Sequence, residues 1–292
     1  MAAKVRGLGR VVGDRYAMML FSLLRKRAER EPDFRGIVVP IDDLIGHNLI
    51  ATGRFESTQI DAVYTLLANP TLAGRAQSGR FVDVGANIGL YSLAFSSHFL
   101  STLAIEANPH TFLVLKANLA LRHKDEVTAV CVGASNTTAE AEIHVPLNGN
   151  LGWATLNAAH HKIPTQSLPV IVRPLDDIIK ENRGPRVELL KIDVEGHEPK
   201  VFEGASRTLN VDGPIVMFEV LDADAGERCS QILRDCGYSH FYTFRRDWPT
   251  GSNKFNRMWR GWRSGLPVLI EALRPGSMHK APLVCAAKSP IA

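Results

Sequence analysis

The sequence predicts an α/β fold in which a mostly parallel, doubly wound sheet is closed at one edge by an antiparallel strand. Three observations support this fold class. Strand-like and helix-like segments alternate from Arg80 onward, and a glycine-rich turn joins the first strand to its helix. Four of the predicted strands end on an acidic residue, namely Asp83, Glu106, Asp193 and Glu219. Because parallel strands place their carboxyl ends at one edge of the sheet, we expect a ligand to bind where these acids gather.

Short apolar runs and turn residues define the individual elements. We predict strands at 81–84, 102–106, 127–132, 141–145, 168–172, 187–192 and 215–218, and helices at 89–98, 109–122, 175–179, 199–209 and 224–235. Asn108 followed by Pro109 stops one strand and opens a helix. The runs 238–244 and 282–287 are expected to pair antiparallel and close the sheet, with a basic, tryptophan-bearing insertion at about 245–280 between them.

The region before Arg80 does not show the regular alternation of strands and helices. Residues 1–30 indicate a basic helix or a partly ordered arm. We predict two short strands at 36–41 and 46–50 and the start of a helix at Ser57. We interpret residues 1–79 as a lid or oligomer surface, and residues 80–292 as the cofactor-binding domain.

Bulk composition indicates a soluble globular protein, with 45% hydrophobic and 22% charged residues in 292. No apolar run approaches the roughly 18 residues that span a bilayer. The run 16–24 continues into Arg25-Lys26-Arg27 with no small-residue cleavage site, which favours an amphipathic helix over a signal peptide. The four cysteines form no C-x-x-C pair, a pattern typical of free thiols in the cytoplasm.

A net charge of +4 does not by itself indicate nucleic acid, but the basic residues are clustered. One cluster occupies residues 4–30, and a second occupies 245–263, where arginines and a lysine alternate with Trp248, Trp259 and Trp262. Solvated helix faces explain most such runs. For the second cluster, contact with an anionic or sugar-bearing partner is an equal alternative.

The turn Asp83-Val-Gly85-Ala-Asn87-Ile-Gly89 indicates an adenosine ligand. Gly85 and Gly89 let the backbone approach a ligand, and Glu106 stands where an acid accepts bonds from both ribose hydroxyls. The glycine triplet of dinucleotide folds is broken at Asn87, and the carboxylate of Asp83 disfavours pyrophosphate. A ligand that carries an ammonium and a sulfonium suits this turn, which predicts S-adenosylmethionine. We predict that Asp83, Gly85, Asn87, Gly89, Glu106 and Ser135 bind the cofactor. The alternative is a βαβ unit whose glycines serve only the turn.

Catalytic candidates follow the strand at 187–192. Methylating an alcohol needs a general base or a metal, because a hydroxyl is a poor nucleophile at neutral pH. We predict His197 as the base, with Asp193 and Glu219 positioning the hydroxyl or binding Mg²⁺. Structural alternatives are a helix-cap role for His197, an ion pair of Asp193 with Lys191 or an arginine, and favourable placement of Glu195 and Glu198 at a helix N-terminus.

These stretches resemble the FkbM family of S-adenosylmethionine-dependent methyltransferases. The matching segments are 45–56, 82–89, 104–109, 175–177 and 190–198, of which Lys-Ile-Asp-Val-Glu-Gly is the most particular. The resemblance implies a class I methyltransferase (Rossmann-like) fold and O-methylation of sugars, glycolipids or polyketide natural products. It also implies that Asp83, Gly85, Asn87 and Gly89 line the cofactor pocket and that Glu106 holds the ribose.

We therefore expect an O-methyltransferase acting on a hydroxyl of a sugar-containing, glycolipid or secondary-metabolite acceptor. One alternative is a methyltransferase of nucleic acid or protein nitrogen, although the Asn/Asp-Pro-Pro-aromatic motif of such enzymes is replaced here by Ile-Asp-Val-Glu-Gly. Another is a non-catalytic scaffold that docks a partner or an anionic membrane through its basic N-terminal helix. We expect a small-molecule or glycan acceptor and no nucleic acid. Peripheral membrane contact, a homo-oligomer and a need for Mg²⁺ stay open.

Overall fold

The computed structural model describes residues 15–23, 26, 36–40, 43–147, 151–157, 163–246, 268–273, 281 and 283–291. Its helices are α2 (Leu44–Thr52), α3 (Ser57–Leu67), α4 (Pro70–Ser78), α5 (Leu90–Phe95), α6 (Pro109–Leu121), α7 (Leu175–Glu181), α8 (Glu198–Glu203) and α9 (Ala223–Asp235). Its strands are β1 (Arg80–Val84), β2 (Ser101–Glu106), β3 (Val127–Cys131), β4 (Gly133–Ser135), β5 (Ala139–Pro146), β6 (Thr165–Pro174), β7 (Val187–Ile192), β8 (Ile215–Glu219), β9 (His240–Arg246), β10 (Val268–Ala272) and β11 (Leu283–Ala287).

The large sheet has the strand order β10-β9-β11-β8-β7-β1-β2-β3. Strands β3, β2, β1, β7 and β8 are parallel, and β11 lies antiparallel between β8 and β9. The predicted closing pair is therefore confirmed, as is the mostly parallel sheet. The structure adds β10, which pairs antiparallel with β9 and falls within the predicted insertion. Trp248, Trp259 and Trp262 of the basic cluster lie outside the described residues.

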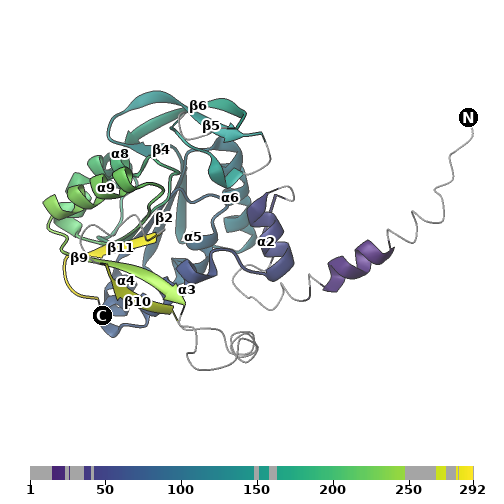
Figure 1. Cartoon of the computed structure of the whole chain (residues 1–292), viewed down its shortest axis with the longest axis horizontal. Helices are drawn as coiled ribbons and strands as arrows, with labels where there is room; N and C mark the ends of the chain where they lie inside the picture. Colours follow the sequence, from purple (N-terminus) through teal and green to yellow (C-terminus); the bar gives the residue numbers. More distant parts are fainter. Residues whose placement is uncertain are drawn as a thin grey trace, which may run out of the picture.

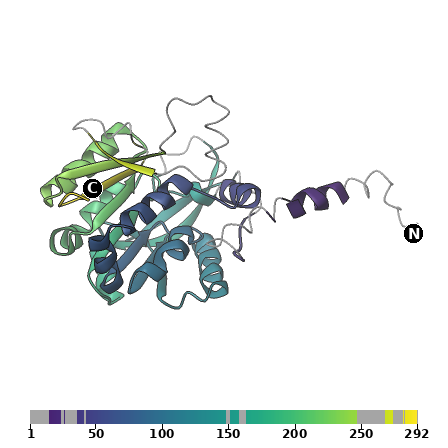
Figure 2. The same cartoon turned by 90° about the horizontal axis from the view of Figure 1, so that it is seen from below.

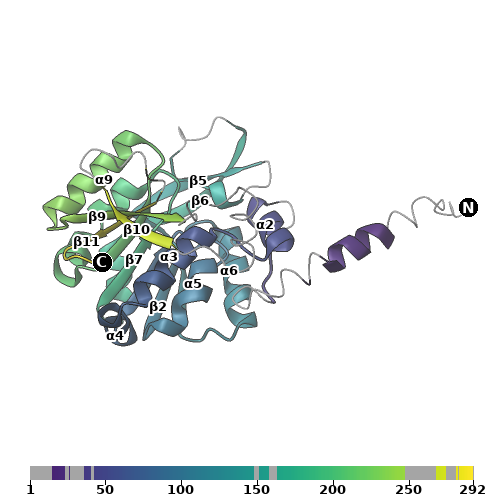
Figure 3. The same ribbon diagram turned by 60° about the horizontal axis from the view of Figure 1, so that its bottom comes forward.

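Helices cover both faces of this sheet, as Figures 1 and 3 show. On one face α3, α4 and α5 pack on Phe81, Leu189 and Met217, and α6 packs on Ala104. On the other face α7, α8 and α9 pack on the neighbouring strand positions, whose side chains point the opposite way. The turned view in Figure 2 shows the same layering from below. Asp83 and Lys191 are register partners on β1 and β7, so their side chains share the α5 face.

A second, three-stranded sheet has the order β4-β6-β5 and lies near the top of Figure 1. Strand β4 runs parallel to β6, whereas β5 and β6 form an antiparallel pair. A short 3₁₀ turn, Leu151–Trp153, lies between β5 and β6 in the chain and contacts β5. This sheet therefore brings a tryptophan-bearing loop to the carboxyl ends of the central strands.

The strand predicted at 46–50 is wrong, because these residues lie inside helix α2. The side chain of Asp43 accepts the N–H of Ile45 at 2.6 Å and caps the helix, and Gly53 ends it with φ 74°. Ile45 and Leu49, four residues apart, both pack on Ile88 and Leu90. The run of apolar residues is thus one face of a helix rather than a strand.

The strand predicted at 36–41 is not formed by its described part, residues 36–40. Instead of pairing with a strand, Val38 donates its N–H to the side chain of Asn118 at 2.6 Å and accepts from the same amide at 3.1 Å. The helix predicted from Ser57 is confirmed as α3. Whether residues 1–79 act as a lid or an oligomer surface stays a prediction. No helix among the described residues has both the length and the apolar character needed to cross a membrane.

Candidate functional site

A pocket opens at the carboxyl ends of β1, β2, β7 and β8, where the sequence predicts ligand binding. Its walls come from the turn after β1, the end of β2, the segment after β7, helix α2 and the loop before β6. Its lining includes Ile45, Phe55, Glu56, Gly85, Asn87, Tyr91, Glu106, Trp153, Lys191, Asp193, Glu195 and Glu219.

Gly85 and Asn87 line the pocket as predicted from the turn motif. Gly85 has φ +73°, and a Cβ there would lie 1.7 Å from the carbonyl oxygen of Asp193, so only glycine lets the β1 turn approach the end of β7. Gly89 serves a different purpose. It does not contribute to the pocket lining, and a Cβ on it would meet Leu115 of α6 at 2.6 Å. Gly89 therefore permits close helix packing behind the site.

Glu106 occupies the end of β2 and faces the pocket. Its two carboxyl oxygens accept the backbone N–H groups of Asn87 and Asn108, each at 2.8 Å. Burial raises the pKa of Glu106 to about 7, against the lowering effect of these two bonds. Because a carboxylate offers about four acceptor positions, two remain to receive hydroxyl donors from the pocket side.

Asp83 lies behind the pocket rather than in its lining. Its fully buried carboxyl accepts the hydroxyl of Ser92 at 2.7 Å and lies 3.7 Å from Lys191 Nζ. The same ammonium lies 3.1 Å from Asp193 and 4.5 Å from the centre of the Tyr91 ring. Burial acts to lower the pKa of Lys191, but Asp193, Asp83 and Glu56 outweigh it and raise that pKa. The ion pair between Asp193 and Lys191, one of the structural alternatives, is present.

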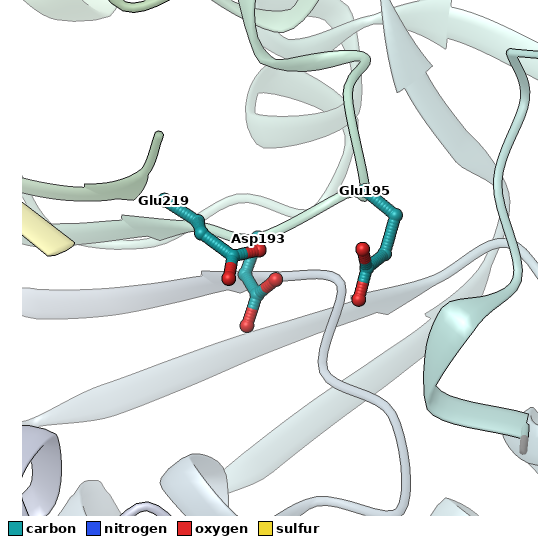
Figure 4. A group of neighbouring side chains, drawn as sticks. All are labelled: Asp193, Glu195 and Glu219. Atoms are coloured by element: carbon teal, nitrogen blue, oxygen red, sulfur yellow. The ribbon is translucent and has the colours of Figure 1, made fainter. Parts of the chain in front are cut away.

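Asp193 also belongs to a group of three carboxyl groups, which Figure 4 shows. Oxygens of Asp193, Glu195 and Glu219 lie within 4.8 Å of one another. Burial, followed by repulsion from Asp193, raises the pKa of Glu195 to about 8 and that of Glu219 to about 9. Glu195 has a left-handed backbone, with φ 52°, and its carboxyl group lies with those of Asp193 and Glu219.

Glu56 adds a fourth carboxyl from the N-terminal region. It accepts the hydroxyl of Tyr91 at 2.8 Å and is held at φ 48° where α3 begins. Burial, with repulsion from Asp193, raises its pKa to about 7. The described lining of the pocket contains one cationic side chain, that of Lys191, and five carboxyl groups, those of Glu56, Glu106, Asp193, Glu195 and Glu219. This excess of carboxyl groups favours a cationic ligand, because buried carboxylates are stabilised by opposite charge.

His197 and Ser135 disagree with the roles predicted for them. Neither side chain lines the pocket; instead Ser135 Oγ and His197 Nε2 lie 3.0 Å apart and join β4 to the start of α8. Burial, with repulsion from Lys200, lowers the pKa of His197 to about 4. A histidine that is hard to protonate and outside the pocket lining is poorly placed to remove a substrate proton.

Glu198 fits its structural alternative, because its carboxyl accepts the N–H groups of Val194 and Gly196 at 3.1 and 3.2 Å. Sequence reasoning assigned no site role to Glu56, Tyr91, Lys191 or Trp153. Glu56 and Lys191 carried a signal, as the last residue of the segment 45–56 and as the lysine of the Lys-Ile-Asp-Val-Glu-Gly motif. Tyr91 and Trp153 carried none, because only the tertiary structure brings α5 and the loop before β6 to the pocket.

Comparisons with known proteins identify the family to which the chain belongs. Residues 83–240 match the family model described as the methyltransferase FkbM domain. Over 148 residues the chain is 28% identical to the hexuronic acid methyltransferase AglP of Haloferax volcanii, covering 49% of this chain and 55% of that protein. The match thus spans about half the length of this curated relative.

Two solved structures show weaker likeness. Methyltransferase FkbM from Methylobacillus flagellatus is 18% identical, with a TM-score of 0.41, covering 88% of this chain and 58% of that one. The METTL16 methyltransferase domain is 12% identical, with a TM-score of 0.49, covering 89% of this chain and 76% of that one. The family match covers more than half of the chain. The protein therefore belongs to the FkbM methyltransferase family.

Proposed function

We propose that the protein transfers the methyl group of S-adenosylmethionine to a hydroxyl of a sugar-containing, glycolipid or secondary-metabolite acceptor. The observation that carries this proposal is the pocket itself. The pocket is lined by the glycine-rich turn after β1, by Glu106 at the end of β2, and by more carboxyl groups than cationic groups. The relative AglP, whose name assigns it a hexuronic acid, supports a sugar acceptor.

Cofactor binding in this proposal uses both ends of the pocket. Glu106 would hold the ribose hydroxyls through its remaining acceptor positions, and Gly85 and Asn87 would form the wall beside them. Asp193 and Glu219 would hold the ammonium and sulfonium, whose positive charge would stabilise the ionised form of these carboxyl groups. Asp83 acts indirectly, because it holds Lys191 and Ser92 in place behind the turn.

Transfer is an in-line displacement in this proposal. The acceptor oxygen forms a bond to the methyl carbon while the carbon–sulfur bond breaks, and the bonding electrons pass to sulfur to leave S-adenosylhomocysteine. Asp193 and Glu219 orient the hydroxyl, and one of these carboxylates takes its proton. Most of the acceleration comes from holding the two reactants together in line.

Mg²⁺ at Asp193 and Glu219 stays a prediction, now with Glu195 beside them. The same carboxylates suit either a hard cation or the charges of the cofactor. Retention of full activity after chelation with EDTA would favour the cofactor as the cation that they serve.

Trp153 is the proposed acceptor contact. It lines the pocket and is 46% exposed. Flat aromatic rings pack on the apolar faces of sugars, and an exposed ring near the reacting centre suits that purpose.

The test is calorimetric titration with S-adenosylmethionine, with two variants of one pocket. Glu106→Gln should lower cofactor affinity by about tenfold or more, because one good hydrogen-bonded charge contributes roughly 1.5–3 kcal/mol. Trp153→Ala should leave cofactor affinity unchanged and raise KM for an acceptor found by screening hexuronic acids and related glycans. Absence of cofactor binding by the unaltered protein would refute the proposal. A loss of cofactor affinity in Trp153→Ala would refute only the acceptor role.

A further inference from the structure

A helix near the N-terminus exposes apolar side chains that the methyltransferase site does not use. Residues 15–23 are helical, and Lys26 is again in helical conformation. The large hydrophobic side chains of this helix are 49–68% exposed, namely those of Tyr16, Met18, Met19, Leu20, Phe21 and Leu23. Figures 1, 2 and 3 all draw this helix, in purple, away from the α/β body. Helices with so wide an apolar surface are normally buried, so this one lacks its natural surroundings.

The polar positions of the helix are basic. Arg15 and Ser22 are seven residues apart and therefore share one face, and Lys26 follows Ser22 by four residues. The sequence adds Arg25 and Arg27 and contains no acidic residue between positions 15 and 28. A narrow basic stripe beside a broad apolar surface is the pattern of helices that lie on anionic membranes.

Length decides how such a helix meets a bilayer. Residues 15–23 extend about 14 Å at about 1.5 Å per residue, well short of the roughly 30 Å hydrocarbon core. The segment is therefore too short to span and suited to lie at the interface. There the apolar side chains enter the acyl region while the cations remain among the headgroups.

We infer that the helix at residues 15–23 is a membrane-surface anchor that docks the protein on anionic phospholipid headgroups. A second copy of the chain is the less favoured occupant. Antiparallel pairing of two such helices would bring Arg15 of one copy toward Lys26 of the other, and the four cations of residues 15–27 outnumber the flanking acids Asp14 and Glu29. The inference concerns attachment and holds whatever the acceptor proves to be.

The test is co-sedimentation of the full chain with vesicles of phosphatidylglycerol or of phosphatidylcholine. We expect preferential binding to phosphatidylglycerol that weakens as salt is added. The double variant Arg15→Gln, Lys26→Gln should weaken that binding by about fivefold for each cation removed. Leu20→Glu combined with Phe21→Glu should abolish it, because both side chains would have to enter the acyl region charged.

Leu113→Glu is the matched control, since Leu113 is 67% exposed on α6 and lies outside the anchor. It should bind vesicles as the unaltered protein does. Unchanged binding by the Leu20→Glu, Phe21→Glu variant would overturn the inference, as would equal binding to the two lipids. A concentration-dependent dimer in sedimentation velocity that these substitutions dissolve, without vesicle binding, would assign the helix to a second copy instead. The unaltered circular dichroism spectrum of each variant shows that the α/β body remains folded.

Discussion

Individual carboxyl groups set the chemistry of the pocket. Glu195 and Glu219 have pKa values raised to about 8 and about 9, first by burial and then by their neighbours. Near neutral pH these groups therefore hold protons until a positive charge arrives. A cationic ligand favours the ionised form, so its binding and the loss of these protons are linked.

This linkage predicts that S-adenosylmethionine binding releases protons near pH 7.5. A bound cation lowers the pKa of Glu219 below its value in the free protein, so affinity should rise with pH up to about 9. Titration calorimetry in phosphate and in Tris measures the release, because the two buffers differ in ionisation enthalpy. Glu219→Gln should release fewer protons, whereas Glu142→Gln, at an exposed position of β5, should behave as the unaltered protein. Equal heats in the two buffers would contradict the linkage.

At the scale of elements, the turn between β1 and α5 brings the ends of β1 and β7 together. The carbonyl of Asp193 occupies the space where a side chain on residue 85 would begin. The sequence predicts a glycine turn at this point. The structure shows that glycine is needed there because the end of β7, about a hundred residues later in the chain, packs against the turn.

Gly85→Ala should therefore destabilise the protein by about 2–4 kcal/mol, because it combines a backbone clash with positive φ. Gly74 lies within α4 with no atom within 4 Å of its added Cβ, so Gly74→Ala should stabilise by roughly 0.5–1 kcal/mol. Urea unfolding of the two variants measures both changes. A similar effect of the two substitutions would show that the contact with Asp193 does not limit the turn.

Helix α2 illustrates why short apolar runs mislead. Residues 46–50, Gly-His-Asn-Leu-Ile, are a short run that ends on two apolar side chains, and so short a run is compatible with either a strand or a helix. The cap at Asp43 and the burial of Ile45 and Leu49 on Ile88 and Leu90 give the helix instead. Tertiary packing decided between two local patterns of similar strength.

For the whole molecule, the buried carboxyl groups make stability depend on pH. Glu56, Glu106 and Glu219 have folded-state pKa values above the usual 4.5, so above pH 4.5 the folded state binds more protons than the unfolded state. Stability contributed by these groups is lost as pH rises. His197 has a pKa lowered from 6.5 to about 4, so its contribution makes stability increase with pH, but only between about pH 4 and 6.5.

Between about pH 7 and 9, the free protein should therefore become less stable, by at most about 1.4 kcal/mol per pH unit for each such group. Glu219→Gln should reduce the decline, because it removes the carboxyl whose pKa is highest in this window. Thermal unfolding across this range, with and without S-adenosylmethionine, measures both effects. Stability that increases over the same range would contradict the assignment of raised pKa values to the pocket.

The sequence by itself determined the fold class and the cofactor turn. Continuous apolar runs ending on acids are short-range signals, so β1, β2, β7 and β8 with Asp83, Glu106, Asp193 and Glu219 were predictable. The family resemblance, carried by local motifs, was predictable for the same reason. Even so, the sequence could not separate Asp83, which supports the pocket from behind, from Glu106, which faces it.

Only the tertiary structure decided which side chains share the pocket. It brought Glu56 from before the first strand and Trp153 from the loop before β6 to the carboxylates that follow β7 and β8. It also turned His197 toward Ser135 and away from the pocket. The direction of a side chain and its burial depend on packing between segments far apart in the chain, and the pKa values that govern the chemistry depend on that burial.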